Sequence, residues 1–156
     1  MRRGRVPDGW RQDATSESAV LSRPVVQRTD EGARRLGERY WVAVARASRG
    51  LVRPLRTDTG VELRVLGHGP PLLRLAGPEV VVAEDCVTCR YRIVGGLLAR
   101  APAGVLTLTQ SSSELRAAVT EYTPRLRPGL YTHLQRRFHV AVSRRYFGAL
   151  IAEADA

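Results

Sequence analysis

Alternating apolar and polar residues predict strands along most of the chain from Arg39 onward. Residues 40–45 (YWVAVA) fit a first strand, and residues 48–59 fit the connection that follows it. Gly and Pro residues separate the later strands, which are predicted at 61–65, 72–75, 80–83, 86–94 and 105–110. Residues 115–122 fit either a helical stripe or a strand face, and the nearby strand 105–110 favours a hairpin.

The C-terminal segment 130–154 predicts one long amphipathic helix, because Gly148 is the only helix breaker in it. On a helical wheel its apolar side is formed by Leu130, Tyr131, Leu134, Phe138, Ala141, Val142, Ala149 and Ala152. Arg145 falls within this side. A buried guanidinium must reach water, pair with a carboxylate or face an anionic ligand.

Residues 1–36 are polar and carry few bulky apolar side chains, so we expect a poorly ordered N-terminal extension. A short helix across Glu31 to Glu38 also fits the end of this segment. The domain itself is predicted at 37–156. The predicted fold class is α+β, with a curved antiparallel sheet packed on the long C-terminal helix. A hydrophobic content of 44% is enough for a packed core.

The formal charge of +10 comes from 25 basic residues, all of them arginine, while lysine and asparagine are absent. This usage is typical of GC-rich codons, so part of the arginine excess reflects base composition. The charge alone is therefore weak evidence for an anionic partner. Apolar runs are too short for a transmembrane segment, and the first residues resemble no signal peptide, so we expect a cytoplasmic protein.

Cys86 and Cys89 are the only cysteines, and their spacing resembles a redox or metal motif. The surrounding residues alternate as a strand, which turns the two thiols to opposite faces. That arrangement suits neither a disulfide nor a shared metal ion. His133 and His139 lie too far along the chain for a zinc finger. We therefore expect Cys89 in the core and no metal.

Catalytic and cofactor motifs are not recognised. The sequence contains no nucleophile elbow, phosphate-binding loop or dinucleotide fingerprint, so no cofactor is predicted. His68 lies in a turn rich in Gly and Pro, where we expect it to be exposed. His133 lies on the arginine-rich side of the last helix, and His139 beside the apolar stripe, where a structural role is commoner than a catalytic one.

The hairpin VLTLTQSSSELRAAVTEYTPRL and the following helix PGLYTHLQRRFHVAVSRRYFGAL resemble the START-like (SRPBCC, polyketide cyclase and ligand-transport) superfamily. The resemblance covers residues 39–154. It implies a helix-grip fold with a cavity between the sheet and the last helix, but no shared catalytic residues. The family usually has two short helices after the first strand, whereas only about fourteen residues are available here.

Three functions follow as hypotheses. The first is a binder of a small hydrophobic ligand, with a cavity lined by Trp41, Tyr91, Tyr122, Phe138 and Arg145. The second is a basic protein that binds nucleic acid or an anionic surface through Arg90, Arg92, Arg136, Arg137 and Arg144. The third is a cyclase-like enzyme of unknown reaction.

Overall fold

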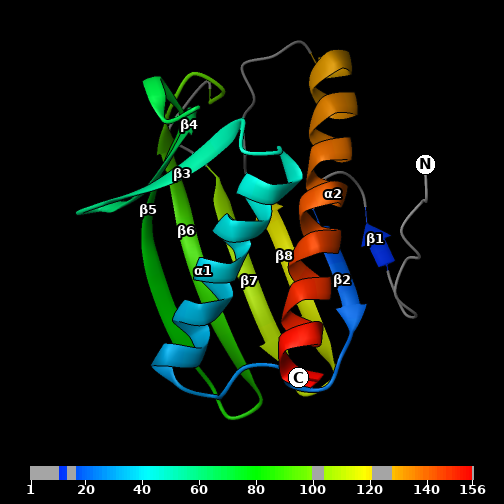
Figure 1. Cartoon of the computed structure of the whole chain (residues 1–156). Coiled ribbons are helices and arrows are strands. Elements are labelled where there is room, and N and C mark those ends of the chain that lie inside the picture. Colours follow the sequence, from blue (N-terminus) through cyan, green and yellow to red (C-terminus); the bar gives the residue numbers. More distant parts are fainter. Residues whose placement is uncertain (1–10, 14–16, 100–103, 121–127, 156) are drawn as a thin grey trace.

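A curved antiparallel sheet with two helices on one face forms the fold (Figure 1). The computed structural model describes the backbone of residues 11–13, 17–99, 104–120 and 128–155, and the side chains of 17–99, 104–120 and 137–155. Within these residues, the sheet order is β1-β2-β8-β7-β6-β5-β4-β3. The predicted α+β class, with a curved sheet on a long C-terminal helix, is confirmed.

Six consecutive strands form a meander, and the two N-terminal strands extend the sheet beyond its last strand. The bounds are Arg11–Asp13 (β1), Glu17–Leu21 (β2), Val52–Thr57 (β3), Gly60–Val65 (β4), His68–Val82 (β5), Cys86–Gly95 (β6), Val105–Ser111 (β7) and Glu114–Thr120 (β8). Strands β3 to β8 pair in sequence order, and β2 pairs with β8. The predicted hairpin between β7 and β8 is thus confirmed.

Strand β5 differs from the two strands predicted for this segment. It is one strand of 15 residues. Its pairing with β6 shifts register between Ala76 and Glu79, around Gly77 and Pro78. The two residues that predict a turn therefore lie within an irregular but continuous strand.

Helix α1 (Asp30–Ala47) occupies the segment where the sequence predicts the first strand, so that prediction is wrong. Thr29 is the N-cap, and its hydroxyl accepts a hydrogen bond from the amide of Gly32 at 3.1 Å. The buried residues then recur every three or four positions, at Ala33, Leu36, Tyr40 and Ala43. The helical period of this stripe is stronger than the strand preference of the aromatic and β-branched residues at its end.

The expected disordered extension is wrong for residues 17–36. Strand β2 lies inside the sheet beside β8, and Val20 is 1% exposed. Ala33 and Leu36 are fully buried in the first half of α1. A few apolar residues are enough to order this segment, because backbone hydrogen bonds to β8 stabilise β2 and the Thr29 cap stabilises the start of α1. Residues 1–10 and 14–16 lie outside the described residues.

Helix α2 (Pro128–Asp155) confirms the predicted long helix, but its buried face is rotated from the predicted one. Among its residues with described side chains, 137–155, the buried ones are His139, Val142, Ser143, Tyr146, Phe147 and Leu150. Phe138, Ala141 and Arg145 are exposed instead. The buried face contains His and Ser, so hydropathy alone selects the wrong side of the helix.

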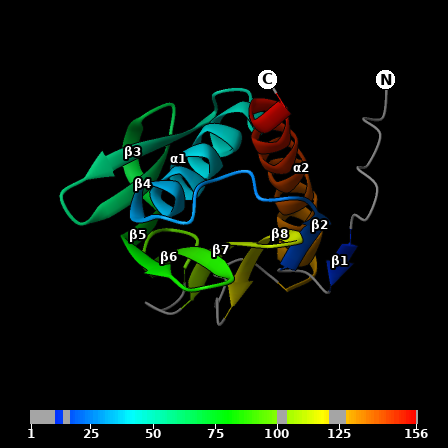
Figure 2. The ribbon, with the colours of Figure 1, turned by 90° about the horizontal axis from the view of Figure 1, so that it is seen from below.

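The two helices lie side by side on the same face of the sheet (Figure 2). They contact each other through Tyr40 of α1 and Tyr146 of α2, whose ring centroids are 5.3 Å apart in an edge-to-face arrangement. The inward residues of β6, among them Val87, Cys89 and Tyr91, join the same core. Neither described helix combines the length and hydrophobicity that a membrane span needs.

Candidate functional site

A groove of about 480 Å³ runs between α1 and the β3–β4 hairpin. This volume lies within the range of small-molecule sites, about 300–1,000 Å³. Helix α1 supplies one wall, and the edge strand β3 with its neighbour β4 supplies the other. The groove is lined by Arg35, Glu38, Arg39, Trp41, Val42, Ala45, Pro54, Arg56 and Val61.

The floor of the groove is apolar and rigid. Trp41 packs edge-to-face against Tyr40 and Tyr91, at centroid distances of 5.2 and 5.1 Å. Tyr91 is only 3% exposed, and burial raises the pKa of its hydroxyl to about 12. Val61 of β4 is buried, whereas Val42 of α1 is exposed. The indole is therefore held in place, while Val42 remains open to a bound molecule.

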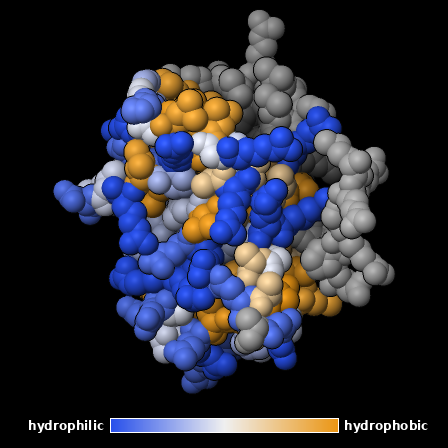
Figure 3. Space-filling view, viewed as in Figure 1, coloured by the Kyte–Doolittle hydropathy of each residue, from blue (hydrophilic) through white to orange (hydrophobic). Residues whose placement is uncertain are grey.

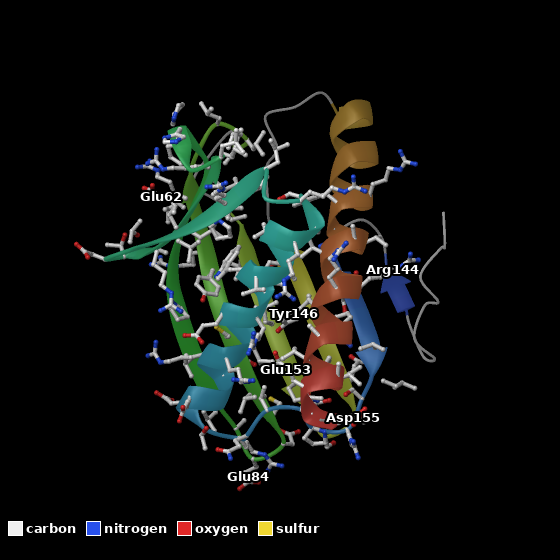
Figure 4. The ribbon with its side chains drawn as sticks, viewed as in Figure 1. Glu62, Glu84, Arg144, Tyr146, Glu153 and Asp155 are labelled. Atoms are coloured by element: carbon white, nitrogen blue, oxygen red, sulfur yellow. The ribbon has the colours of Figure 1, made fainter. Side chains whose placement is uncertain are left out.

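The rim of the groove is charged. Arg56 of β3 reaches across to Glu38 of α1, with 2.8 Å between Nη2 and Oε1. Arg35 and Arg39 both contact the carboxylate of Glu153 at 2.8 and 2.9 Å. Figure 4 shows Glu153 on α2, close to α1. Three arginines therefore face two carboxylates, so the rim has one unbalanced positive charge.

The ion pairs of the rim contribute little stability, so a ligand can displace them. The side chains of Arg56 and Glu38 are 78% and 55% exposed. Exposed ion pairs of this kind typically contribute about 0–1 kcal/mol. An incoming carboxylate could therefore replace Glu38 or Glu153 as the partner of an arginine at little cost.

A second group of polar side chains is buried on the inner face of α2. His139, Ser143 and Tyr146 are spaced four and three residues apart, so they point the same way, and Tyr146 lies between the helices in Figure 4. Within the described part of the chain, His139 Nε2, Ser143 Oγ and Tyr146 Oη have no hydrogen-bond partner, and neither does Ser18 Oγ of β2. Burial lowers the pKa of His139 to about 4, so its imidazole is neutral at pH 7.

The residues predicted to line a ligand cavity are not all brought together. Trp41 and Tyr91 are in contact, and Trp41 lines the groove. Phe138 is 38% exposed on the outer side of α2, and Arg145 is exposed there too. The guanidinium of Arg145 is therefore hydrated, because the buried face of α2 does not include this residue. Tyr122 lies outside the described residues.

The arginines predicted to bind an anionic partner lie on two faces of the molecule. Arg90 and Arg92 alternate with the core residues of β6, so they point away from the helices. Arg137 and Arg144 are exposed on α2, on the helix side of the sheet. Arg144 lies on the side of α2 turned away from α1 (Figure 4). The side chain of Arg136 lies outside the described residues, and the others form no continuous surface.

The cysteine pair lies on strand β6, as the sequence predicts. Cys89 is fully buried and Cys86 half-buried, and both are free thiols. Burial is the main cause that raises the pKa of Cys89 to about 11, so its thiol is unreactive at neutral pH. Among the residues with described side chains, no three His, Cys, Asp or Glu groups cluster to hold a metal ion.

The arginines and Glu38 of the groove are not among the residues predicted from the sequence to bind a ligand. They belong to residues 35–56, where the sequence predicts an extension with a short helix at 31–38, then a strand and a connection. A helix beginning at Thr29 would have placed Arg35, Glu38, Arg39 and Val42 on one side of α1, because they are three and four residues apart. Comparisons with protein-family models, curated proteins and solved structures found no match to this chain.

Proposed function

We propose that this protein binds a small amphipathic molecule with one carboxylate in the groove between α1 and the β3–β4 hairpin. The observation that carries this proposal is the combination of a rigid apolar floor with a rim that has one excess positive charge. Ligand sites are typically apolar with a few placed polar groups.

The chemistry of the groove selects the ligand class. An apolar body would pack on Trp41 and Val42, which together offer a flat ring and an exposed aliphatic surface. The carboxylate would pair with Arg39 or Arg56, because a guanidinium can donate two parallel hydrogen bonds to a carboxylate. One negative charge balances the rim, so a monoanion is favoured over a dianion.

The topology supports a ligand carrier of the START-like kind. Two strands precede α1, a six-strand meander follows it, and a long helix is the last element. One continuous helix stands where that superfamily usually has two short ones. We propose the groove rather than the space under α2, because Tyr146 and Phe147 fill the described part of that interface and are 1% and 0% exposed.

Binding rather than reaction is the activity that the groove supports. Its nine described lining residues include no Ser, Cys, His or Lys, and their one carboxylate, Glu38, is ion-paired with Arg56. The arginines stay charged at all physiological pH values. They can orient a carboxylate but do not act as an acid or a base near pH 7.

The test uses the fluorescence of Trp41. Trp10 is the only other tryptophan, so a Trp10→Phe background leaves Trp41 as the sole reporter. Titration with decanoate should change its emission saturably, and decanol should bind at least about tenfold more weakly because it lacks the charge.

Two substitutions locate the site. Arg39→Gln with Arg56→Gln should reduce decanoate affinity about tenfold or more. Arg34→Gln, on the same helix but outside the groove lining, should leave it unchanged. Equal affinity for decanoate and decanol, or an equal loss in the Arg34 variant, would contradict a carboxylate site in this groove.

A further inference from the structure

One end of the β3–β4 hairpin carries apolar side chains that are open to water. Leu51, Val65 and Leu66 are 53%, 41% and 49% exposed. The amide of Leu66 donates to the carbonyl of Leu51 at 2.8 Å, and Val65 pairs with Val52 across the hairpin, so the three residues are neighbours. We call them the apolar tip. Figure 3 shows apolar side chains gathered at the top of the view, where β3, β4 and β5 meet.

The backbone conformation of Leu66 does not favour a leucine at this position. Leu66 has φ of 53° and Gly67 has φ of 79°, so both lie in the left-handed region. Two-residue hairpin turns of this kind favour Asn, Asp or Gly at the first position, because a bulky side chain is strained there. Leu66 is thus unfavourable for the turn and exposed to water, and the core gains nothing from it.

Two arginines flank Leu51 of the apolar tip, and we call them the basic collar. Arg49 precedes Leu51 in the turn after α1, and Arg53 follows it, with its Nε donating to the carbonyl of Gly50 at 3.3 Å. Both arginines are exposed. The sequence has no acidic residue from Arg39 to Thr57 or from Val65 to Pro78. The acid in between that is closest in sequence to the tip, Glu62, is ion-paired with Arg64 at 2.6 Å.

Exposed leucines beside the basic collar match the chemistry of an anionic lipid surface. Leucine side chains can enter the boundary between headgroups and acyl chains, while arginines pair with the negative headgroups. Nucleic acid would use the arginines but would leave the leucines in water. We propose that the apolar tip docks this protein on anionic bilayers, with Leu51 and Leu66 inserted and Arg49 and Arg53 on the headgroups.

This inference does not depend on the groove or its ligand. The tip residues are absent from the groove lining, so either proposal can fail while the other holds. If both hold, the groove would lie near the membrane from which an amphipathic acid could be taken.

The experiment measures partitioning of the full chain onto sedimented vesicles at low salt. Vesicles of phosphatidylcholine with roughly one-third phosphatidylserine should bind the wild type, and pure phosphatidylcholine should bind it at least about tenfold more weakly. Raising the salt should weaken binding to the anionic vesicles. Wild-type protein that stays in the supernatant with both kinds of vesicle overturns the proposal.

The decisive variant is Leu51→Ser with Leu66→Asn. Asparagine suits the left-handed turn at position 66, so the variant should fold at least as well as the wild type, and its thermal unfolding checks this. Its binding to anionic vesicles should fall at least about tenfold. Leu21→Ser is the matched control, because Leu21 is 60% exposed at the end of β2, away from the hairpin.

The variants also separate lipid insertion from charge alone. If the double leucine variant binds as the wild type does, while Arg49→Gln with Arg53→Gln does not bind, the surface is a purely electrostatic one and lipid insertion is refuted. An equal loss of binding with Leu21→Ser would likewise refute the tip. Loss with the leucine pair and retention with Leu21→Ser is the result that the proposal predicts.

Discussion

Replacing His139 with leucine should remove much of the acid sensitivity of this protein. His139 is 6% exposed, and its Nε2 has no hydrogen-bond partner among the described residues. Its pKa is lowered by burial from the ordinary value of 6.5 to about 4. The folded chain therefore holds a neutral imidazole at pH values where the unfolded chain binds a proton.

The direction and size of the effect follow from this difference. Because the unfolded state binds more protons between pH 6.5 and pH 4, the free energy of unfolding falls as the pH falls. The loss of stability begins as the pH falls below the unfolded pKa of 6.5 and is complete below the folded pKa of about 4. A pKa of about 4 against 6.5 gives a loss of about 2 kcal/mol between pH 7 and pH 5, and about 3 kcal/mol in all.

Urea denaturation at a series of pH values from 7 to 5 tests this prediction. The wild type should lose about 2 kcal/mol more over this range than His139→Leu does. His68→Gln is the matched control, because it replaces an exposed histidine at the start of β5. Parallel pH profiles for the wild type and His139→Leu would refute the reasoning.

Three further predictions concern Gly37, Gly148 and the two cysteines. Gly37→Ala should destabilise the protein by about 1–3 kcal/mol, because its Cβ would lie 2.5 Å from Tyr91 Oη and 2.9 Å from Cys89 Sγ. Gly148→Ala should instead stabilise α2 by up to about 1 kcal/mol, since no heavy atom lies within 4 Å of its Cβ. In native protein, iodoacetamide should modify Cys86 and spare Cys89, with both modified in urea; rapid native labelling of Cys89 would show that its burial is wrong.

The strands of the meander and the long last helix could be predicted because local patterns decide them. Val87, Cys89 and Tyr91 alternate with polar residues and do face the core. Of α1, the sequence indicates only a short helix across Glu31 to Glu38, because Tyr40 to Ala45 have strand-like side chains, while the cap that starts the helix lies eleven residues earlier at Thr29. The rotated face of α2 was missed because His139 and Ser143 are buried, which hydropathy opposes.

The site could be predicted only in part. Trp41 and Tyr91 were expected to be together, and they are in contact across α1 and β6. The pairing of Arg39 with Glu153 joins residues more than a hundred positions apart, and only the packing of α1 against α2 brings them together. Such contacts depend on tertiary structure, so a local pattern in the sequence carries no information about them.

A native mass spectrum that compares the wild type with Ala45→Phe tests the groove most directly. Ala45 is half-buried in the groove lining, so a phenyl ring there should fill the space. Ala152→Phe places the same ring on an exposed position of α2 and is the control. After incubation with decanoate, the wild type and Ala152→Phe should carry its mass, which acid releases, and Ala45→Phe should not. An adduct retained by Ala45→Phe, or a wild type that stays bare, would contradict binding in the groove.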